Sequence, residues 1–283
     1  MNILQAALLG VVEGITEFLP ISSDGHLFLV REILRWPDQG LAFDAVLHLG
    51  TLLAIVIGLW REWLGVLRGL ASILKTRKIW STPEQRLIVL LVLATLPGAL
   101  AGFFFESIFA ETFRSLLSVG LWFAATGAFY FFVEYSPRVL ARTKSKALAK
   151  TIEAQPSAVG ALWIGLAQAA ALLPGVSRSG MTIATGTLLG LSRKNAAPFS
   201  FLMAGPITFG AIVKSFLEPS GSGSLTGNSW GPLFVGIVVA FVVGWFALKI
   251  LLRYLKTHTL KAFGSYMLGV GGAVLLLKIL GAW

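Results

Sequence analysis

Apolar residues fill most of this chain in long runs, and short polar segments separate the runs. A helix needs about 20 apolar residues to cross the hydrocarbon core of a bilayer. Six runs reach about that length and predict transmembrane helices at 41–60, 87–105, 116–133, 197–217, 232–252 and 262–280. We therefore expect an all-α polytopic membrane protein.

Two more apolar regions, 3–34 and 158–191, are each interrupted by a turn that contains proline, serine and glycine. Each half of these regions is too short to cross a bilayer comfortably. We expect both regions to form re-entrant helical hairpins. Irregular backbone at membrane depth persists only where it is buried in protein or lines a wet cavity, so the two turns predict an internal site.

The two interrupted regions are also similar in sequence. Residues 10–25 align without gaps on residues 165–180, at an offset of 155 positions (165 − 10). The aligned pairs include Gly10 with Gly165, Glu13 with Gln168, Ser22 with Ser177, Ser23 with Arg178 and Gly25 with Gly180. The similarity is modest, and its weight depends on whether the topology repeats as well.

The basic residues predict the topology. The segments 61–86 and 135–155 carry six and five Lys or Arg residues, whereas 106–114 carries one and 219–231 carries none. Loops rich in Lys and Arg face the cytoplasm. The first hairpin is then expected to enter the membrane from the outer side, and the second from the cytoplasmic side.

This topology is that of an inverted repeat. Residues 1–134 form the first repeat and 158–283 the second, and a cytoplasmic connector at 135–157 joins them. Each repeat holds one hairpin and three spans, and because three is odd the second repeat is inverted relative to the first. Such an architecture places the site where the two hairpin turns meet near the middle of the membrane.

The composition agrees with a membrane protein. The chain is 56% hydrophobic and 13% charged, with a mean hydropathy of +0.81. Its net charge of +10 is explained by cytoplasmic loops, so we expect no nucleic-acid partner. There is no cysteine, which excludes disulfides and thiolate metal sites.

The first hairpin carries two glutamates in an apolar segment, where charged side chains are costly and usually functional. Glu13 and Glu17 are four positions apart and share one helix face. Three roles stay open: ligands of a hard divalent cation, a general base, or ion-pair partners of Arg178.

The turn after Glu17 offers a nucleophile. Ser23 and His26 are three positions apart and face the same way if a helix begins after Pro20. A serine with a histidine is the minimal activated-nucleophile pair. Ser22 is either the N-cap of that helix or a phosphate ligand.

The second turn favours an anion. A turn rich in glycine and serine, a following helix and a guanidinium together suit a phosphate-like group. The expected phosphate ligands are Ser177, Arg178, Ser179 and Gly180. On the first span, Asp44 and His48 either extend the site or form a buried pair that satisfies itself, and we prefer the pair.

These motifs resemble a known family. The stretch from Glu13 to Ser23, with Gly25-His26, and the stretch from Pro174 to Gly180 are similar to the two signature motifs of the bacterial undecaprenyl pyrophosphate phosphatases of the bacitracin-resistance type. The resemblance covers the whole chain. It implies an enzyme of the bacterial plasma membrane that removes the terminal phosphate of undecaprenyl diphosphate, which regenerates the lipid carrier of peptidoglycan precursors.

The resemblance also implies roles for single residues. Glu13 and Glu17 match the glutamate motif of the family, Ser23 and His26 match its Ser/His motif, and Arg178 matches its phosphate-binding arginine. Mg²⁺ or Ca²⁺ on Glu13 and Glu17 would neutralise the diphosphate. Asp24 stands where the family often has threonine, and it either adds a metal ligand or repels the substrate. The choice between a phosphoserine intermediate and direct attack by water stays open.

Other functions are compatible with parts of the pattern. An inverted-repeat transporter or a flippase for the lipid carrier would bind the same anion without cleaving it. A second class of membrane lipid phosphatase needs a histidine soon after the Ser-Arg pair, but the first histidine after Arg178 is His258. The expected partners are a polyprenyl diphosphate and membrane lipids, and the sequence leaves a homodimer open.

Overall fold

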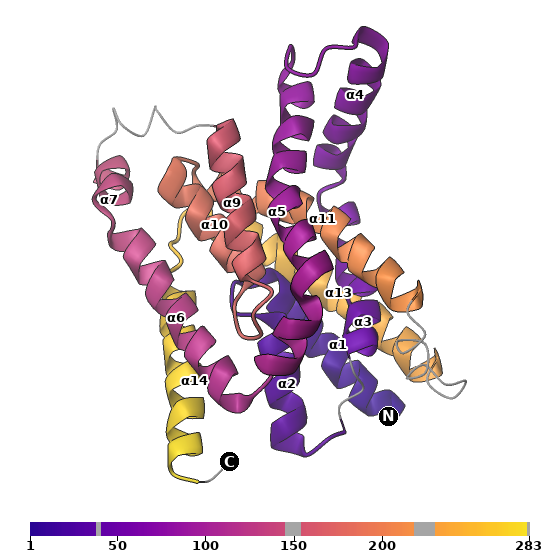
Figure 1. Ribbon diagram of the computed structural model, residues 1–283, viewed down its shortest axis with the longest axis vertical. Coiled ribbons are helices and arrows are strands. Elements are labelled where there is room, and N and C mark those ends of the chain that lie inside the picture. The colour runs from indigo at the N-terminus through magenta and orange to yellow at the C-terminus, as the bar shows by residue number, and fades with distance from the viewer. Residues whose placement is uncertain (38–40, 145–153, 218–229, 282–283) are drawn as a thin grey trace.

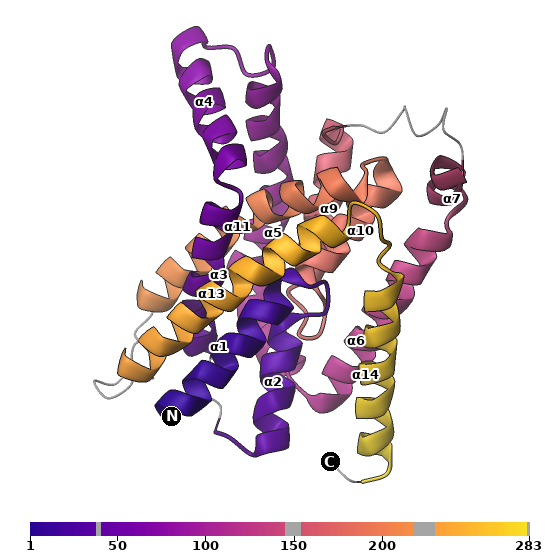
Figure 2. The same cartoon turned by 180° about the vertical axis from the view of Figure 1, so that it is seen from behind.

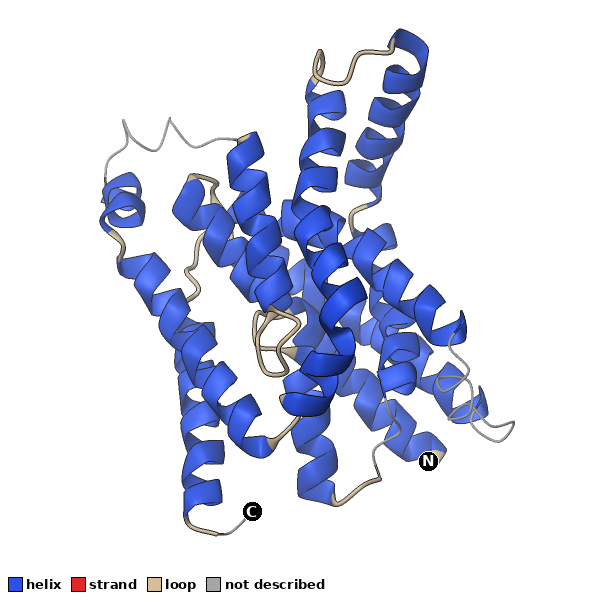
Figure 3. Ribbon diagram, viewed as in Figure 1, coloured by secondary structure: helices blue, strands red, loops and turns tan. Residues whose placement is uncertain are grey.

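The computed structural model describes residues 1–37, 41–144, 154–217 and 230–281, which form helices and connecting loops (Figures 1 and 3). The helices in chain order are α1 (Ile3–Phe18), α2 (Ser23–Leu34), α3 (Leu41–Gly58), α4 (Trp60–Thr76), α5 (Pro83–Thr112), α6 (Leu116–Tyr135), α7 (Pro137–Lys144), α9 (Ala158–Ala170), α10 (Arg178–Leu189), α11 (Arg193–Leu217), α13 (Trp230–Tyr254) and α14 (Lys261–Ile279).

All six predicted spans lie on helices. Five helical segments in the described ranges are long and apolar enough to cross a membrane, namely Pro83–Phe105 of α5 and the helices α6, α11, α13 and α14. Helices α3 and α4 form a sixth candidate that is bent by 78°. The prediction of an all-α polytopic membrane protein is confirmed, with helix ends that differ from the predicted ends by a few residues.

The segment 61–86 was expected to be a basic loop, and this is wrong for most of its length. It forms most of α4, an amphipathic helix with leucines at 64, 67, 70 and 74 on one side and basic residues elsewhere. The helical spacing of these leucines is not apparent from the number of basic residues in the segment. Figure 1 shows α4 and the beginning of α5 projecting together beyond the other helices.

Two expected loops are described only in part. The connector predicted at 135–157 contains the eight-residue helix α7, and its residues 145–153 lie outside the described ranges. The loop expected at 219–231 also lies mostly outside the described ranges, which resume at Trp230.

Both interrupted regions are helix pairs broken at their polar turns. Helices α1 and α2 have 16 and 12 residues, and α9 and α10 have 13 and 12. Leu19 ends α1 in an extended conformation (φ −61°, ψ 135°), because the ring of Pro20 disfavours helical backbone in the residue before it. Ser22 then begins α2 as its N-cap at a φ of 73°, an unusual value for a residue with a side chain.

The two helix pairs come from opposite ends of the molecule. The α1–α2 pair opens toward the end that holds both chain termini, and the α9–α10 pair opens toward the end that holds α4 and α7 (Figure 1). Helix α13 packs against α1 and α3, while α5 packs against α9 and α11. Helices α6 and α14 lie side by side, as Figure 2 shows from behind. The two turns therefore approach each other in the interior.

Helix α6 supports both turns through two aromatic side chains. A Cβ atom added at Gly25 would overlap the ring of Phe123, and one added at Gly180 would overlap the hydroxyl of Tyr130. The Tyr130 hydroxyl also donates a hydrogen bond to the carbonyl of Pro20 at 3.0 Å. The two glycines that the sequence alignment pairs thus share a structural reason, which is close approach to α6.

We predict that Gly180→Ala destabilises the fold by about 1–3 kcal/mol, because the added methyl group displaces the buried Tyr130 ring. Thermal unfolding of the purified protein in detergent measures this change. The matched control is Gly210→Ala in α11, where an added Cβ meets no atom within 4 Å. Equal melting temperatures for the two variants would contradict the prediction.

Candidate active site

A pocket of about 240 Å³ lies where the two turns meet. Residues of α1, α2, α3, α5, α9, α10 and α11 line it. Its walls are apolar apart from a set of polar side chains near the turns, which includes Thr16, Glu17, Ser22, Ser23, Asp24, His48, Gln168, Ser177, Arg178, Ser179 and Thr208. Polar residues from both sequence motifs therefore line one cavity, although Glu13 and His26 are not among them.

Glu17 is the point where the two turns make contact. Its carboxylate is buried, accepts a hydrogen bond from Ser23 Oγ at 2.6 Å, and forms an ion pair with the guanidinium of Arg178. Arg178 also donates to Thr208 Oγ1 on α11 at 2.9 Å. The pairing of a glutamate with Arg178, one of the three roles left open by the sequence, occurs at Glu17.

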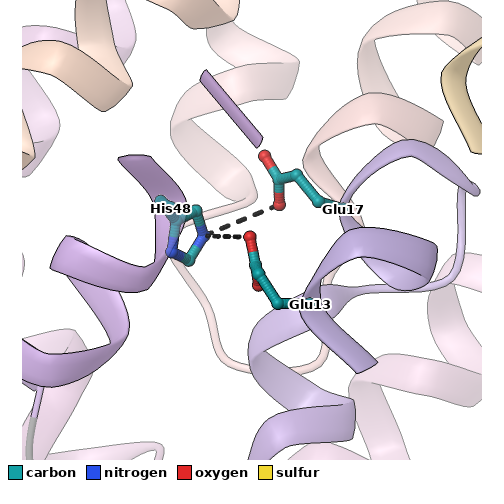
Figure 4. A group of neighbouring side chains, drawn as sticks. All are labelled: Glu13, Glu17 and His48. Atoms are coloured by element: carbon teal, nitrogen blue, oxygen red, sulfur yellow. Dashed lines mark ion pairs between the residues drawn. The ribbon is translucent and has the colours of Figure 1, made fainter. Parts of the chain in front are cut away.

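Glu13 lies one turn earlier on α1 and is fully buried. Its Oε1 accepts a hydrogen bond from Thr51 Oγ1 at 3.1 Å, and its Oε2 has no hydrogen-bond partner in the described part of the chain. Glu13 and Glu17 both face His48 of α3, whose Nε2 is 3.6 Å from an oxygen of each (Figure 4). These three side chains form a group that could hold a metal ion.

The orientation of the His48 ring matters for this group. Its Nδ1 is 2.7 Å from the carbonyl oxygen of Asp44, which can only accept, so Nδ1 carries a proton. Nε2 then points its lone pair, or a second proton, at the two carboxylates. Three electron-rich atoms within 4.8 Å of one another need a positive charge among them, either a proton on His48 or a metal ion.

The preferred hypothesis for Asp44 and His48, a pair that satisfies itself, is wrong. The Asp44 carboxylate forms ion pairs with Arg31 and Arg114, and His48 hydrogen-bonds to the backbone carbonyl of Asp44 rather than to that carboxylate. His48 is therefore a candidate site residue, because it faces Glu13 and Glu17 rather than the Asp44 carboxylate. The available signal was a histidine inside an apolar span, which is costly without a use.

His26 lies apart from the nucleophile with which the sequence paired it. Its Nδ1 hydrogen-bonds to the carbonyl of Ser22 at 2.7 Å, and its Nε2 lies 2.7 Å from the hydroxyl of Tyr266. The ring stacks on Phe123 and Tyr266, with centroids 5.1 and 5.6 Å away. Ser23 instead donates to Glu17, so the structure does not bring His26 and Ser23 together as a hydrogen-bonded pair.

The two turns begin their second helices in the same way. Ser22 caps α2 by accepting from Gly25 N at 3.4 Å, and Ser177 caps α10 by accepting from Gly180 N at 3.2 Å. Both hydroxyls also line the pocket. The N-cap hypothesis for Ser22 is thus confirmed.

Of the remaining predicted phosphate ligands, two line the pocket and one packs against a neighbouring helix. Arg178 and Ser179 line the pocket at the start of α10. Gly180 is not among the lining residues and faces Tyr130 instead. Asp24 lies at the pocket wall and is exposed, outside the group formed by Glu13, Glu17 and His48.

The charges around the pocket do not favour a polyanion by themselves. Glu17, Asp24 and Asp44 line the pocket, and Glu13 lies next to Glu17. The lining guanidiniums are those of Arg178, which Glu17 already contacts, and of Arg114. The nearby Asp44 is matched by its own arginines. A phosphate group that entered this pocket would need a further positive charge.

Comparison with known proteins shows the family of this chain. Residues 6–273 match the family described as bacitracin resistance protein BacA. The chain is 39% identical over 282 residues to the undecaprenyl-diphosphatase of Pelobacter propionicus, covering 99% of both chains. It is 40% identical over 283 residues to the undecaprenyl-diphosphatase of Rubrobacter xylanophilus, covering 99% of this chain and 100% of the relative. The chain belongs to the bacitracin resistance protein BacA family.

Proposed function

We propose that this chain hydrolyses undecaprenyl diphosphate to undecaprenyl phosphate and phosphate, which recycles the lipid carrier for cell-wall synthesis and confers bacitracin resistance. The full-length relatives carry this activity in their names. The observation that carries the proposal is the contact of Ser23 and Arg178 with one buried carboxylate, that of Glu17. A nucleophile, a base and an anion ligand thereby meet in one pocket.

The geometry favours Ser23 as the nucleophile and Glu17 as its base. The Ser23 hydroxyl already donates to Glu17, the arrangement that activates a serine. In the proposed step Ser23 Oγ attacks the terminal phosphorus while Glu17 takes the hydroxyl proton. The bond from that phosphorus to the bridging oxygen breaks, and undecaprenyl phosphate leaves with the electron pair. Water then hydrolyses the phosphoserine and releases phosphate.

Arg178 connects substrate binding to this step. Its guanidinium is shared between Glu17 and Thr208, and it lies at the N-terminus of α10, where phosphate groups bind well. A phosphate that draws Arg178 toward itself weakens the ion pair with Glu17. Glu17 is then a stronger acceptor for the Ser23 proton when substrate is present.

A divalent cation fits the group formed by Glu13, Glu17 and His48. The unpartnered Oε2 of Glu13 and the convergence of three ligand atoms support this assignment. Two carboxylates suit Mg²⁺ or Ca²⁺, while the imidazole also admits Mn²⁺ or Zn²⁺. When bound, the cation supplies positive charge that offsets the excess of carboxylates and stabilises the phosphate oxygens.

We further infer that residues 1–134 and 158–283 are inverted repeats joined through 135–157. Two packing relations support this: α1 packs against α13 as α9 packs against α5, and α13 crosses α3 as α5 crosses α11. If α1, α3 and α5 of the first half correspond to α9, α11 and α13 of the second, the two contacts in each relation are counterparts of each other. Basic residues in α4 and α7 support a cytoplasmic location for the end of the molecule that holds these helices, and thus an α1–α2 hairpin that re-enters from the outer side.

Purified protein in detergent is expected to release phosphate from undecaprenyl diphosphate. Glu17→Gln and Ser23→Ala each remove part of the activated nucleophile, and Arg178→Ala removes the anion ligand, so each should lower kcat/KM by about 10²–10⁴. Ser215→Ala is the control, because the Ser215 hydroxyl lines the pocket but bonds to the carbonyl of Ala211 in its own helix. Folded wild-type protein that binds the lipid without releasing phosphate would favour a transporter or flippase instead.

The geometry predicts that His26 positions the turn through the carbonyl of Ser22. His26→Asn keeps a side-chain N–H near the position of Nδ1, and it should retain activity within roughly tenfold of wild type with an unchanged pH profile. His26→Ala should lose more activity than His26→Asn, because it removes the N–H donor. An Asn variant as inactive as Ser23→Ala would show instead that the imidazole takes part in proton transfer.

Metal removal tests the third part of the proposal. We expect EDTA to abolish phosphate release, and Mg²⁺ or Ca²⁺ to restore it, with Mn²⁺ and Zn²⁺ as comparison arms. His48→Ala should raise the metal concentration for half-maximal activity at least about tenfold, since it removes a ligand. His258→Ala, in the loop after α13, is the matched control. Full activity after EDTA, with no metal detected in the protein, would exclude the cation.

A further inference from the structure

Gln168 is a buried polar side chain that nothing in the proposed mechanism uses. It lies on α9, is 3% exposed, and lines the same pocket as Ser23 and Arg178. Its amide oxygen and its amide nitrogen both lack a hydrogen-bond partner in the described ranges. Buried amides are nearly always hydrogen-bonded, and leaving one unpaired destabilises a fold. The missing partner of Gln168 is therefore expected in the pocket.

The surroundings of Gln168 indicate which part of a ligand it meets. A Cβ atom at Gly98 would lie 2.9 Å from the Gln168 amide nitrogen and 3.1 Å from Ile207 Cδ1, so the amide sits among apolar groups. Leu172 and Ile207 continue this apolar wall in the pocket. Ser23 and the two glutamates belong to the other hairpin. Gln168 thus marks the border between the polar centre and an apolar wall suited to a hydrocarbon chain.

We propose that the Gln168 amide donates a hydrogen bond to the phosphate that is directly attached to the prenyl chain, and so positions the leaving group. This inference rests on the proposed function. A prenyl diphosphate has one phosphate to be attacked at Ser23 and a second that joins the head group to an apolar tail. The second phosphate must lie where a polar donor meets an apolar wall, and Gln168 supplies that donor.

The residue type supports this assignment. Gln168 aligns with Glu13, so the two hairpins carry an amide and a carboxylate at equivalent positions. A carboxylate at 168 would add a fourth acid to a pocket that is already lined by Glu17, Asp24 and Asp44. It would repel a diphosphate, whereas an amide of the same shape donates to it without changing the charge.

Steady-state kinetics of the full-length protein in detergent, with undecaprenyl diphosphate as substrate, test the proposal. Gln168→Met keeps the volume and removes the donor, and should raise KM roughly ten- to a hundredfold with kcat within about threefold of wild type. Its melting temperature should stay at or above that of wild type, because an unpaired buried amide is gone. Gln168→Glu should raise KM further, and Gln155→Met, which removes an amide that donates to the carbonyl of Pro83 outside the pocket, should leave KM unchanged.

Product inhibition identifies the phosphate. In Gln168→Met the inhibition constant for undecaprenyl phosphate should rise in proportion to KM, while that for inorganic phosphate stays at the wild-type value. An unchanged KM, or equal weakening of both products, would overturn the inference while leaving the hydrolase intact. A lower melting temperature with unchanged KM would assign Gln168 to packing alone. Absence of phosphate release by wild type would instead count against the proposed function.

Discussion

The buried carboxylate of Glu17 is the constraint on which the rest of the site depends. A carboxylate in an apolar interior is stable only with partners that replace its water shell. Ser23 supplies one partner from the adjacent turn, and Arg178 supplies another from the opposite hairpin. Neither hairpin could bury this charge alone, so the fold brings the two polar turns together. The same contacts hold the proposed nucleophile, Ser23, and the proposed anion ligand, Arg178, next to the proposed base.

Much of this arrangement could be predicted from the sequence because the signals are local. Pro20 and the Gly/Ser-rich turns break helices wherever they occur, and apolar runs of fixed length report spans directly. Glu17 and Arg178 were identifiable because a charge inside an apolar segment is costly. These arguments need no knowledge of which helices are neighbours, and the corresponding helices and turns were located correctly.

The errors concern contacts between residues far apart in the chain. The i,i+3 spacing of Ser23 and His26 suggested a pair, but Tyr266 of α14 and the carbonyl of Ser22 hold the imidazole elsewhere. Asp44 was assigned to His48 because they are one turn apart, yet its arginines come from α2 and the loop after α5. The role of Gly180 depends on the aromatic ring of Tyr130, which no local pattern reveals.

The buried hydroxyl of Tyr130 has a mechanical consequence. It is bonded to the backbone of the first turn at Pro20 and leaves no room for a side chain at Gly180 in the second. Both residues of this hydrogen bond lie within residues 1–134, so α6 holds the turn of the first hairpin independently of the second, while the Tyr130 side chain limits how closely the second turn can approach. One side chain of α6 thus contacts both turns at the pocket.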